Sequence, residues 1–258
     1  MTPDPETGPG APAAPPRPPG MAIPLSRPLF TQVFLGINVV VWLAEMVFGG
    51  SQNTQTLIRF GAKVNDLIVQ GEYWRLLTAT FLHAGIAHLA LNMYALLALG
   101  LEVERLFGRS RFLVLYLLAG LYGSMLSFDF GAPISVGASG AIFGLAGALM
   151  AFLGLRRKML GKLGRQQFIN ITAIIAINLF IGFSLPGIDN LGHLGGLIAG
   201  LAIGWRFAPD YQVGWDVNTN LPMLYDRNSL PRQWLAVAVA IVVLIGGTAF
   251  GVAWHSFA

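Results

Sequence analysis

Apolar residues dominate the chain in seven long runs, and short polar segments separate these runs. The runs cover residues 29–48, 81–101, 112–130, 136–155, 168–185, 190–206 and 233–254. A helix needs roughly 17–25 predominantly apolar residues to cross a bilayer, and each run falls within that range. The pattern therefore predicts an all-α fold, namely a polytopic membrane helix bundle with seven transmembrane helices.

Three other stretches depart from this pattern. Residues 1–28 contain ten of the fifteen prolines, so they are expected to form a disordered Pro-rich tail, and they lack the order of a secretory signal peptide. Residues 50–80 mix polar side chains with Leu, Ile, Phe and Trp, which predicts a structured loop in the membrane interface. Residues 207–232 are expected to form a cytoplasmic loop, and residues 233–258 the seventh helix and the C-terminus.

The composition indicates a membrane protein rather than a soluble domain. The chain of 258 residues is 55% hydrophobic and 11% charged, with a mean hydropathy of +0.64, whereas a soluble domain carries about 25% charged residues. The absence of cysteine excludes disulfides, thiolate metal sites and cysteine nucleophiles. The net charge of +4 does not indicate nucleic-acid binding, because the charged residues cluster in short loops between apolar runs.

Basic residues are distributed unevenly between the two sides of the predicted bundle. One side holds Arg59, Lys63 and Arg75, and the other thirteen of the sixteen Lys and Arg residues lie in the tail or in the loops after the second, fourth and sixth runs. Short loops with an excess of Lys and Arg stay in the cytoplasm. We therefore expect a cytoplasmic N-terminus and an extracytoplasmic C-terminus, in a bacterial inner membrane because no organelle signal is evident.

Polar and reactive side chains gather at one depth of this bundle. With the expected topology, the second, fourth and sixth runs all enter the membrane from the outer face. His83, His88, Ser139 and His193 fall within the first three turns of these runs, and Asn92 follows one turn below His88. At about 1.5 Å rise per residue, all should lie in the outer part of the bilayer. Polar groups at membrane depth are costly and mark functional sites.

Ser139 and His193 are the serine–histidine pair whose predicted depths match. A serine hydroxyl is a weak nucleophile that a neighbouring histidine usually activates, so the pair predicts a nucleophile and a base on two different helices. The alternative is that the spaced glycines around both residues serve helix packing alone, as small-x-x-x-small motifs commonly do. The two interpretations are compatible, because a dyad requires close contact between the helices. These glycines are Gly137, Gly140, Gly144, Gly192, Gly195, Gly196 and Gly200.

His88 and Asn92 are four residues apart and therefore share one helix face. Each can donate a side-chain hydrogen bond, and acyl transfer needs such donors where an oxyanion forms. The backbone N–H of Ser139 is a further candidate donor. The alternative is a polar clamp between helices. His83 is interpreted as structural, and Asp189, at the start of the sixth run, as a helix cap rather than the third member of a triad.

The sequence resembles the rhomboid family of intramembrane serine proteases, over about residues 29–206. The set of motifs in this order and at matching depths is highly specific, although no single motif is. The matching positions are Trp74-Arg75, then His83, His88 and Asn92 with the family's His-x4-His-x3-Asn spacing, Glu104-Arg105, Gly108, Gly137-Ala138-Ser139-Gly140, Gly192-His193, Gly196 and Gly200.

The resemblance implies a rhomboid-like six-helix catalytic core followed by a seventh transmembrane helix. It implies that Ser139 is the nucleophile, His193 the general base, and His88 and Asn92 part of the oxyanion hole of a serine endopeptidase. No metal and no organic cofactor is expected. Phe143 stands where some relatives carry Tyr, so it can pack under the imidazole but cannot donate a hydrogen bond to it.

The expected partners are the lipid bilayer and single-span or polytopic membrane-protein substrates. A peptide bond in an intact helix already has its carbonyl bonded, so substrates should contain Gly, Pro or other helix-weakening residues near the outer boundary. One alternative function is a catalytically silent rhomboid-like protein that binds membrane clients, against which the intact Ser139 and His193 argue. Another is a transporter or channel, which the lack of an evident internal repeat weakens.

Overall fold

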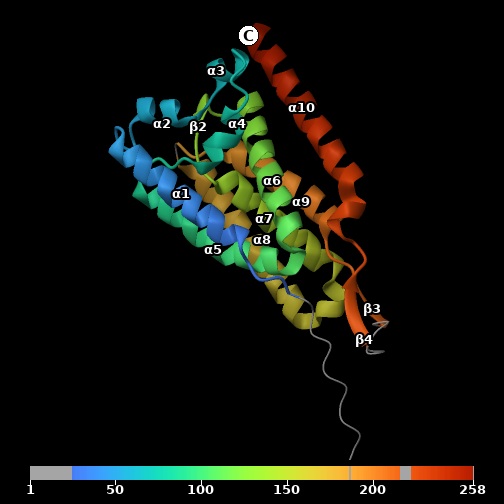
Figure 1. Ribbon diagram of the computed structural model, residues 1–258. Helices are drawn as coiled ribbons and strands as arrows, with labels where there is room; N and C mark the ends of the chain where they lie inside the picture. The colour runs from blue at the N-terminus through green and yellow to red at the C-terminus, as the bar shows by residue number, and fades with distance from the viewer. Residues whose placement is uncertain (1–24, 186, 216–221, 258) are drawn as a thin grey trace, which may run out of the picture.

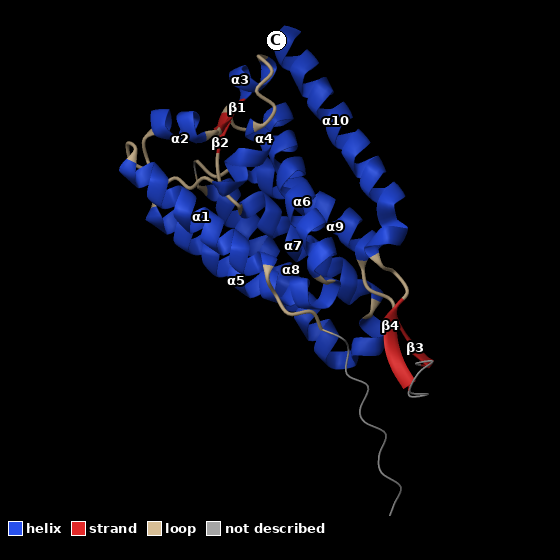
Figure 2. Cartoon of the chain, viewed as in Figure 1, coloured by secondary structure: helices blue, strands red, loops and turns tan. Residues whose placement is uncertain are grey.

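In a computed structural model, which describes residues 25–185, 187–215 and 222–257, the chain forms a bundle of long helices that lie side by side (Figure 1). Short strands contribute two small antiparallel pairs (Figure 2). The predicted all-α membrane bundle is therefore confirmed. Its long helices are α1 (Phe30–Val47), α5 (Ile86–Phe107), α6 (Arg109–Phe130), α7 (Ser139–Leu155), α8 (Arg157–Ser184), α9 (Asn190–Phe207) and α10 (Trp234–Phe257).

Each predicted run corresponds to one long helix, but two helices begin elsewhere than expected. α5 begins at Ile86 rather than at residue 81, because a 3-10 helix, η1 (Ala79–Phe81), and a short loop precede it. α8 begins at Arg157 rather than at residue 168 and bends at Gly161. Within the described residues, five of the helices are long and apolar enough to cross a membrane, and α7 and α9 are not among them. α7 has 17 residues and is surrounded by α5, α6, α8 and α9.

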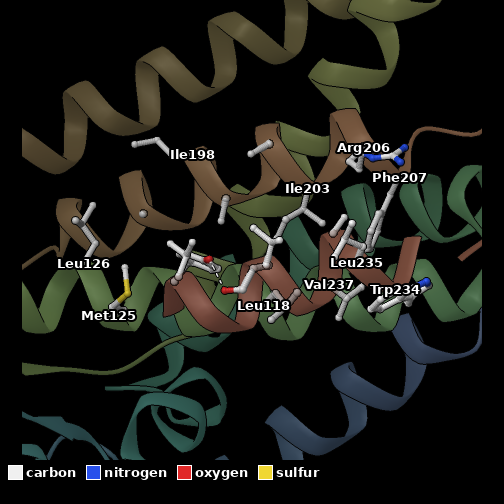
Figure 3. Close-up of a pocket in the computed structure, with 18 of the residues that line it drawn as sticks. Leu118, Met125, Leu126, Ile198, Ile203, Arg206, Phe207, Trp234, Leu235 and Val237 are labelled. Carbon is white, nitrogen blue, oxygen red and sulfur yellow. Dashed lines mark hydrogen bonds between the residues drawn. The ribbon is translucent and has the colours of Figure 1, made fainter. Parts of the chain in front are cut away.

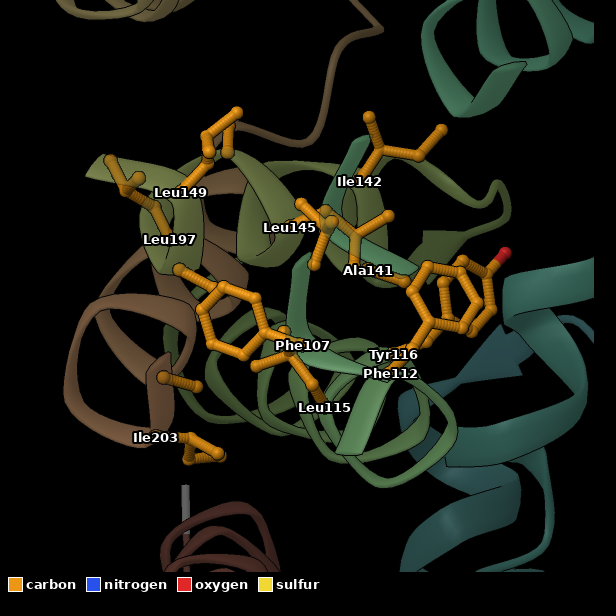
Figure 4. Packing of buried hydrophobic residues seen from close by; sticks show 14 of the residues in the cluster. Phe107, Phe112, Leu115, Tyr116, Ala141, Ile142, Leu145, Leu149, Leu197 and Ile203 are labelled. Atoms are coloured by element: carbon orange, nitrogen blue, oxygen red, sulfur yellow. The ribbon is translucent and has the colours of Figure 1, made fainter. Parts of the chain in front are cut away.

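The apolar core lies between α1, α5, α6, α7 and α9 (Figure 4). Phe34 of α1 stacks on Tyr116 of α6, with ring centroids 4.2 Å apart and an angle of 16° between the planes. Leu145 and Leu149 of α7 are fully buried against this cluster. The core thus places α7 at the centre of the bundle.

Glycines allow α7 and α9 to pack backbone against backbone. A β-carbon on Gly196 would overlap the carbonyl oxygen of Gly140, and a β-carbon on Gly200 would overlap that of Gly144. Lipid tails are as apolar as the helix faces, so close van der Waals packing of small residues is one of the main attractions between membrane helices. The contact fixes the start of α9 beside the start of α7, where the candidate site lies.

The stretch 50–80, which was expected to be structured, folds into α2 (Thr54–Phe60), β1 (Lys63–Val64), α3 (Asn65–Val69), α4 (Arg75–Thr78) and η1. The buried Arg75 holds it together. Its guanidinium donates to Glu72 Oε2 at 2.6 Å and to the carbonyls of Ile58 and Ala62 at 2.8 and 3.1 Å, and it lies 4.6 Å from the ring centroid of Trp74. The Trp74-Arg75 motif therefore stabilises the first loop.

Glu104, from the Glu104-Arg105 motif, caps the first helix. Its Oε1 accepts hydrogen bonds from the backbone N–H groups of Leu29 and Phe30 at 2.7 and 2.9 Å, and its Oε2 accepts from the N–H of Thr31 at 2.8 Å. A carboxylate at a helix N-terminus satisfies N–H groups that have no partner within the helix and interacts favourably with the helix dipole. This bond network joins α1 to the end of α5.

The end of the bundle away from the first loop contains a hairpin within residues 207–232, where a loop was expected. β3 (Tyr211–Trp215) pairs antiparallel with β4 (Pro222–Asp226), and η2 (Leu230–Gln233) leads into α10. Ion pairs tie the hairpin and the segment before it to the helices: Arg111 with Asp226 at 2.5 Å, and Arg156 with Asp210 at 2.9 Å. Most of the predicted disordered tail, residues 1–24, lies outside the described residues, as do residues 216–221.

Gly196→Ala should destabilise the protein by about 1–3 kcal/mol, because the added methyl group forces α7 and α9 apart. The matched control is Gly246→Ala, since a β-carbon on Gly246 of α10 meets nothing within 4 Å. Thermal unfolding in detergent measures both. Equal stability of the two variants would contradict the packing described here.

Candidate active site

A strand pairing and a glycine fix the approach of the chain to Ser139, the first residue of α7. β2 (Ile134–Ser135) pairs with β1 just before the helix, and the N–H of Gly137 donates to the carbonyl of Ala79 at 2.9 Å. Gly137 has a φ of +129°, and a β-carbon there would lie 2.8 Å from the His88 ring. Any other residue at position 137 would therefore strain the backbone and displace the His88 imidazole.

The side chains of Ser139 and His193 meet between α7 and α9. His193 lies in the first turn of α9, and its Nε2 is 2.8 Å from Ser139 Oγ, which is a hydrogen-bond distance. Phe143, one turn along α7, stacks on the imidazole with ring centroids 4.5 Å apart and 11° between the planes. Both polar side chains are half-buried. The two residues expected to pair from their depths are therefore in contact.

Asp189 caps α9 and does not bond to the imidazole. Its Oδ1 accepts a hydrogen bond from the N–H of Gly192 at 2.9 Å, and its Oδ2 accepts one from the hydroxyl of Ser127. Among the described residues, Nδ1 of His193 has no hydrogen-bond partner. The geometry agrees with the cap interpretation, and the stacked Phe143 ring orients the imidazole instead of a carboxylate.

A buried lysine supports the same corner of the bundle. The ammonium of Lys63 donates to Asn65 Oδ1 at 3.0 Å and to the carbonyls of Ser127, at 3.2 Å, and Ala132. Burial lowers the pKa of Lys63 to about 8, although the nearby carboxylate of Asp189 opposes this shift. Lys63 was expected only as a basic residue of the outer side. Its partner Ser127 lies 64 residues along the chain, so no local pattern indicates this role.

His88 and Asn92 lie on one face of α5. Nδ2 of Asn92 donates to the carbonyl of His88 at 2.9 Å; this bond uses one of its two amide N–H groups and leaves the second for another acceptor. Nε2 of His88 and Oγ of Ser139 both border the space that Gly137 leaves open by lacking a side chain. His88 is therefore next to Ser139, and Asn92 follows one turn below on the same face.

His83 lies in the loop before α5 rather than in a membrane-spanning helix, where it was expected. It is fully buried, and its ring packs edge-on against the His88 ring with centroids 5.2 Å apart. Among the described residues, neither of its ring nitrogens has a hydrogen-bond partner. These contacts agree with a structural role, in which His83 supports His88 by packing.

Known proteins are similar in sequence to this chain over most of the bundle. A family model described as "Rhomboid domain" matches residues 70–210. The chain is 51% identical over 175 residues to rhomboid protease GluP of Bacillus subtilis (strain 168), in an alignment that covers 67% of this chain and 34% of that protein. It is 39% identical over 214 residues to RHOMBOID-like protein 6, mitochondrial, of Arabidopsis thaliana, covering 81% of this chain and 69% of that protein.

A further plant relative extends the comparison. RHOMBOID-like protein 1 of Arabidopsis thaliana is 38% identical over 203 residues, which are 76% of this chain and 52% of that protein. The chain thus spans about a third of the length of GluP and about half that of RHOMBOID-like protein 1.

Replacement of Asp189 distinguishes a helix cap from the third member of a triad. Asp189→Asn keeps an oxygen that can accept from Gly192, so labelling of Ser139 by a fluorophosphonate probe should proceed at nearly the rate of the unmodified protein. Asp189→Ala should lower the free energy of unfolding by about 1 kcal/mol, because it removes the cap. A drop in labelling of about 10⁴-fold in Asp189→Asn, the loss expected for a triad aspartate, would reject the cap interpretation.

Proposed function

The chain belongs to the rhomboid family, and on that basis we propose that it is an intramembrane serine endopeptidase. In this proposal Ser139 is the nucleophile and His193 the general base. The substrates are single-span or polytopic membrane proteins, cleaved in or near a transmembrane segment. The relative from Bacillus subtilis is by its name a rhomboid protease, which supports the same reaction for this chain.

The observation that carries the proposal is the 2.8 Å contact between Ser139 Oγ and His193 Nε2. A serine hydroxyl becomes a useful nucleophile when a base removes its proton as the new bond forms. The contact joins residues 54 positions apart on two helices that pack through glycine. A purely structural packing motif does not require an imidazole to point at a hydroxyl, so the contact favours catalysis over packing alone.

The base acts in a dyad. Nδ1 of His193 has no hydrogen-bond partner among the described residues, and the carboxylate of Asp189 is engaged by Gly192 and Ser127. The stacked Phe143 ring restricts rotation of the imidazole and keeps Nε2 directed at Ser139. In the reaction, Nε2 takes the hydroxyl proton while Oγ attacks the carbonyl carbon of the scissile bond.

The oxyanion that forms in this step requires preorganised donors. Ser139 is the first residue of α7, so its N–H has no partner within the helix and is available. His88 and Asn92, on one face of α5, supply two side-chain donors in the proposal. Protonated His193 then gives its proton to the leaving amine, and the acyl-enzyme is hydrolysed when His193 deprotonates a water molecule.

The supply of water and the shape of the substrate follow from the position of the dyad. Ser139 and His193 both lie in the first turns of their helices, so water reaches them from the end of the bundle rather than through lipid. A substrate helix must unwind locally before its carbonyl can be attacked, because that carbonyl is already bonded within the helix. The proposal therefore favours substrates with helix-weakening residues near this boundary.

The orientation in the membrane is part of the proposal. The ends of α5, α7 and α9 that lie opposite the dyad carry the basic loops, and such loops stay in the cytoplasm. This predicts that the dyad opens to the extracytoplasmic side, with a cytoplasmic N-terminus and an extracytoplasmic C-terminus. The proposed compartment is the bacterial inner membrane.

Ser139→Ala should abolish both fluorophosphonate labelling and cleavage of a model transmembrane substrate by the purified protein in detergent, because the nucleophile is removed. Ser184→Ala is the matched control, since Ser184 is an exposed serine of α8 whose hydroxyl bonds only to its own helix in the described structure. It should behave like the unmodified protein. Labelling that persists in Ser139→Ala, or an unmodified protein that neither labels nor cleaves, would instead favour a catalytically silent client-binding protein.

Asn92→Ala should lower kcat by about 10²–10³-fold, the loss expected when one oxyanion donor is removed. Asn178→Ala provides a close control, because Asn178 of α8 makes the same type of bond to the carbonyl four residues earlier, at 2.8 Å, on an exposed helix face. Steady-state cleavage rates separate the two variants. Unchanged turnover in Asn92→Ala would show that the donor assignment is wrong.

A further inference from the structure

A cavity of about 840 Å³ lies between α6, α9 and α10. Neither Ser139 nor His193 lines it. Figure 3 shows Met125 and Leu126 at one end of the cavity and Arg206 and Trp234 at the other, with Leu118, Ile203 and Val237 between them. Its volume falls within the roughly 300–1,000 Å³ that small-molecule sites occupy.

The cavity exists because α10 is attached to α6 and leaves a gap to α9. The hydroxyl of Tyr122 donates to the carbonyl of Ala240 at 2.6 Å, and His255, near the end of α10, is 2.6 Å from the carbonyl of Phe128 through its Nε2. Gly247 lies against the side chain of Met125, where a β-carbon would overlap the sulfur. All of these contacts join α10 to α6, so they fix the open space as part of the fold.

The walls of the cavity select an apolar occupant. They are formed by aliphatic and aromatic side chains over most of the length, and a water molecule needs two to four polar partners to stay in such a space. The bilayer surrounds the bundle and supplies hydrocarbon chains at this depth. A lipid acyl chain is therefore the material that fits between α9 and α10.

The positive charge at one end of the cavity determines which lipid headgroup can bind there. Arg206 is in the last turn of α9, and Arg232 is in η2 just before α10; both are exposed. Their neighbours Arg111 and Arg156 are neutralised by Asp226 and Asp210, whereas no ion pair of Arg206 or Arg232 occurs within the described part of the chain.

The end of the cavity at Arg206 and Arg232 lies at the depth of the lipid headgroups. Trp234, the first residue of α10, is 67% exposed beside the two arginines, and tryptophan prefers the level of the lipid headgroups. Guanidinium groups pair with phosphate through two parallel hydrogen bonds. The position of the arginines is therefore that of a phospholipid phosphate whose chains enter the cavity below it.

We propose that this cavity is a binding site for one anionic phospholipid, with an acyl chain between α9 and α10 and the phosphate on Arg206 and Arg232. Basic pockets between transmembrane helices on the cytoplasmic side bind anionic headgroups in this way. Three helices enclose the acyl chain, which distinguishes the site from the general contact that an outer helix face makes with lipid. The proposal does not depend on peptidase activity.

Native mass spectrometry of the detergent-purified protein tests the site, with phosphatidylglycerol and phosphatidylcholine of identical acyl chains as probes. The protein should retain phosphatidylglycerol in preference. The double variant Arg206→Gln, Arg232→Gln should weaken this binding by about 25-fold, because each basic residue near the membrane surface contributes about fivefold. Ala202→Phe, which fills part of the cavity, should reduce the retention of both lipids.

The matched control is the double variant Arg157→Gln, Arg165→Gln, which removes the same charge from exposed positions of α8 and should retain phosphatidylglycerol normally. Equal loss in the two double variants, or equal retention of both lipids by the unmodified protein, would overturn the proposal. Photo-crosslinking of the unmodified protein with diazirine-bearing phosphatidylglycerol needs no variant to fold. Adducts should concentrate on α6, α9 and α10, and an even spread that includes α1 and α8 would also overturn it.

Discussion

The backbone contact between α7 and α9 is the constraint on which the rest of the structure depends. Gly196 and Gly200 pack against the carbonyls of Gly140 and Gly144, and in a membrane such close packing is a main source of helix association, because the hydrophobic effect does not act between helices there. The same contact sets the two helix starts side by side, with Ser139 Oγ 2.8 Å from His193 Nε2. The residues that bring the helices together thus also create the proposed dyad.

The helices and the pairing of Ser139 with His193 could be predicted from the sequence, because both follow from local features: the length of each apolar run and the depth of each polar side chain. The Trp74-Arg75 and Glu104 motifs were visible, but their roles were not, because Arg75 bonds to carbonyls 13 and 17 residues away and Glu104 caps a helix more than 70 residues away. The two strand pairs, β1 with β2 and β3 with β4, could not be predicted. Their strands have only two to five residues, which is too short for an alternating pattern of apolar and polar residues to indicate them.

The start of α9 is held from a second direction by polar contacts. Ser127 bonds to Asp189, which caps α9, and Lys63 bonds to the carbonyl of Ser127. The first loop, the end of α6 and the helix that carries His193 therefore form one connected corner. α10 joins this corner through His255 and Phe128, although its other half stands away from α9. α10 is thus attached to the bundle at the end near the dyad, and it is separated from α9 at the end where the lipid is proposed to bind.

The most direct test of the central claim is an experimental structure of the protein in a lipid nanodisc after reaction with a fluorophosphonate. The account predicts a phosphorus atom bonded to Ser139 Oγ, a phosphoryl oxygen about 2.7–3.1 Å from donors of His88, Asn92 or the Ser139 N–H, and the His193 ring still stacked on Phe143. A phosphorus atom on any other residue, or α7 and α9 so far apart that the imidazole cannot reach Ser139, would contradict it.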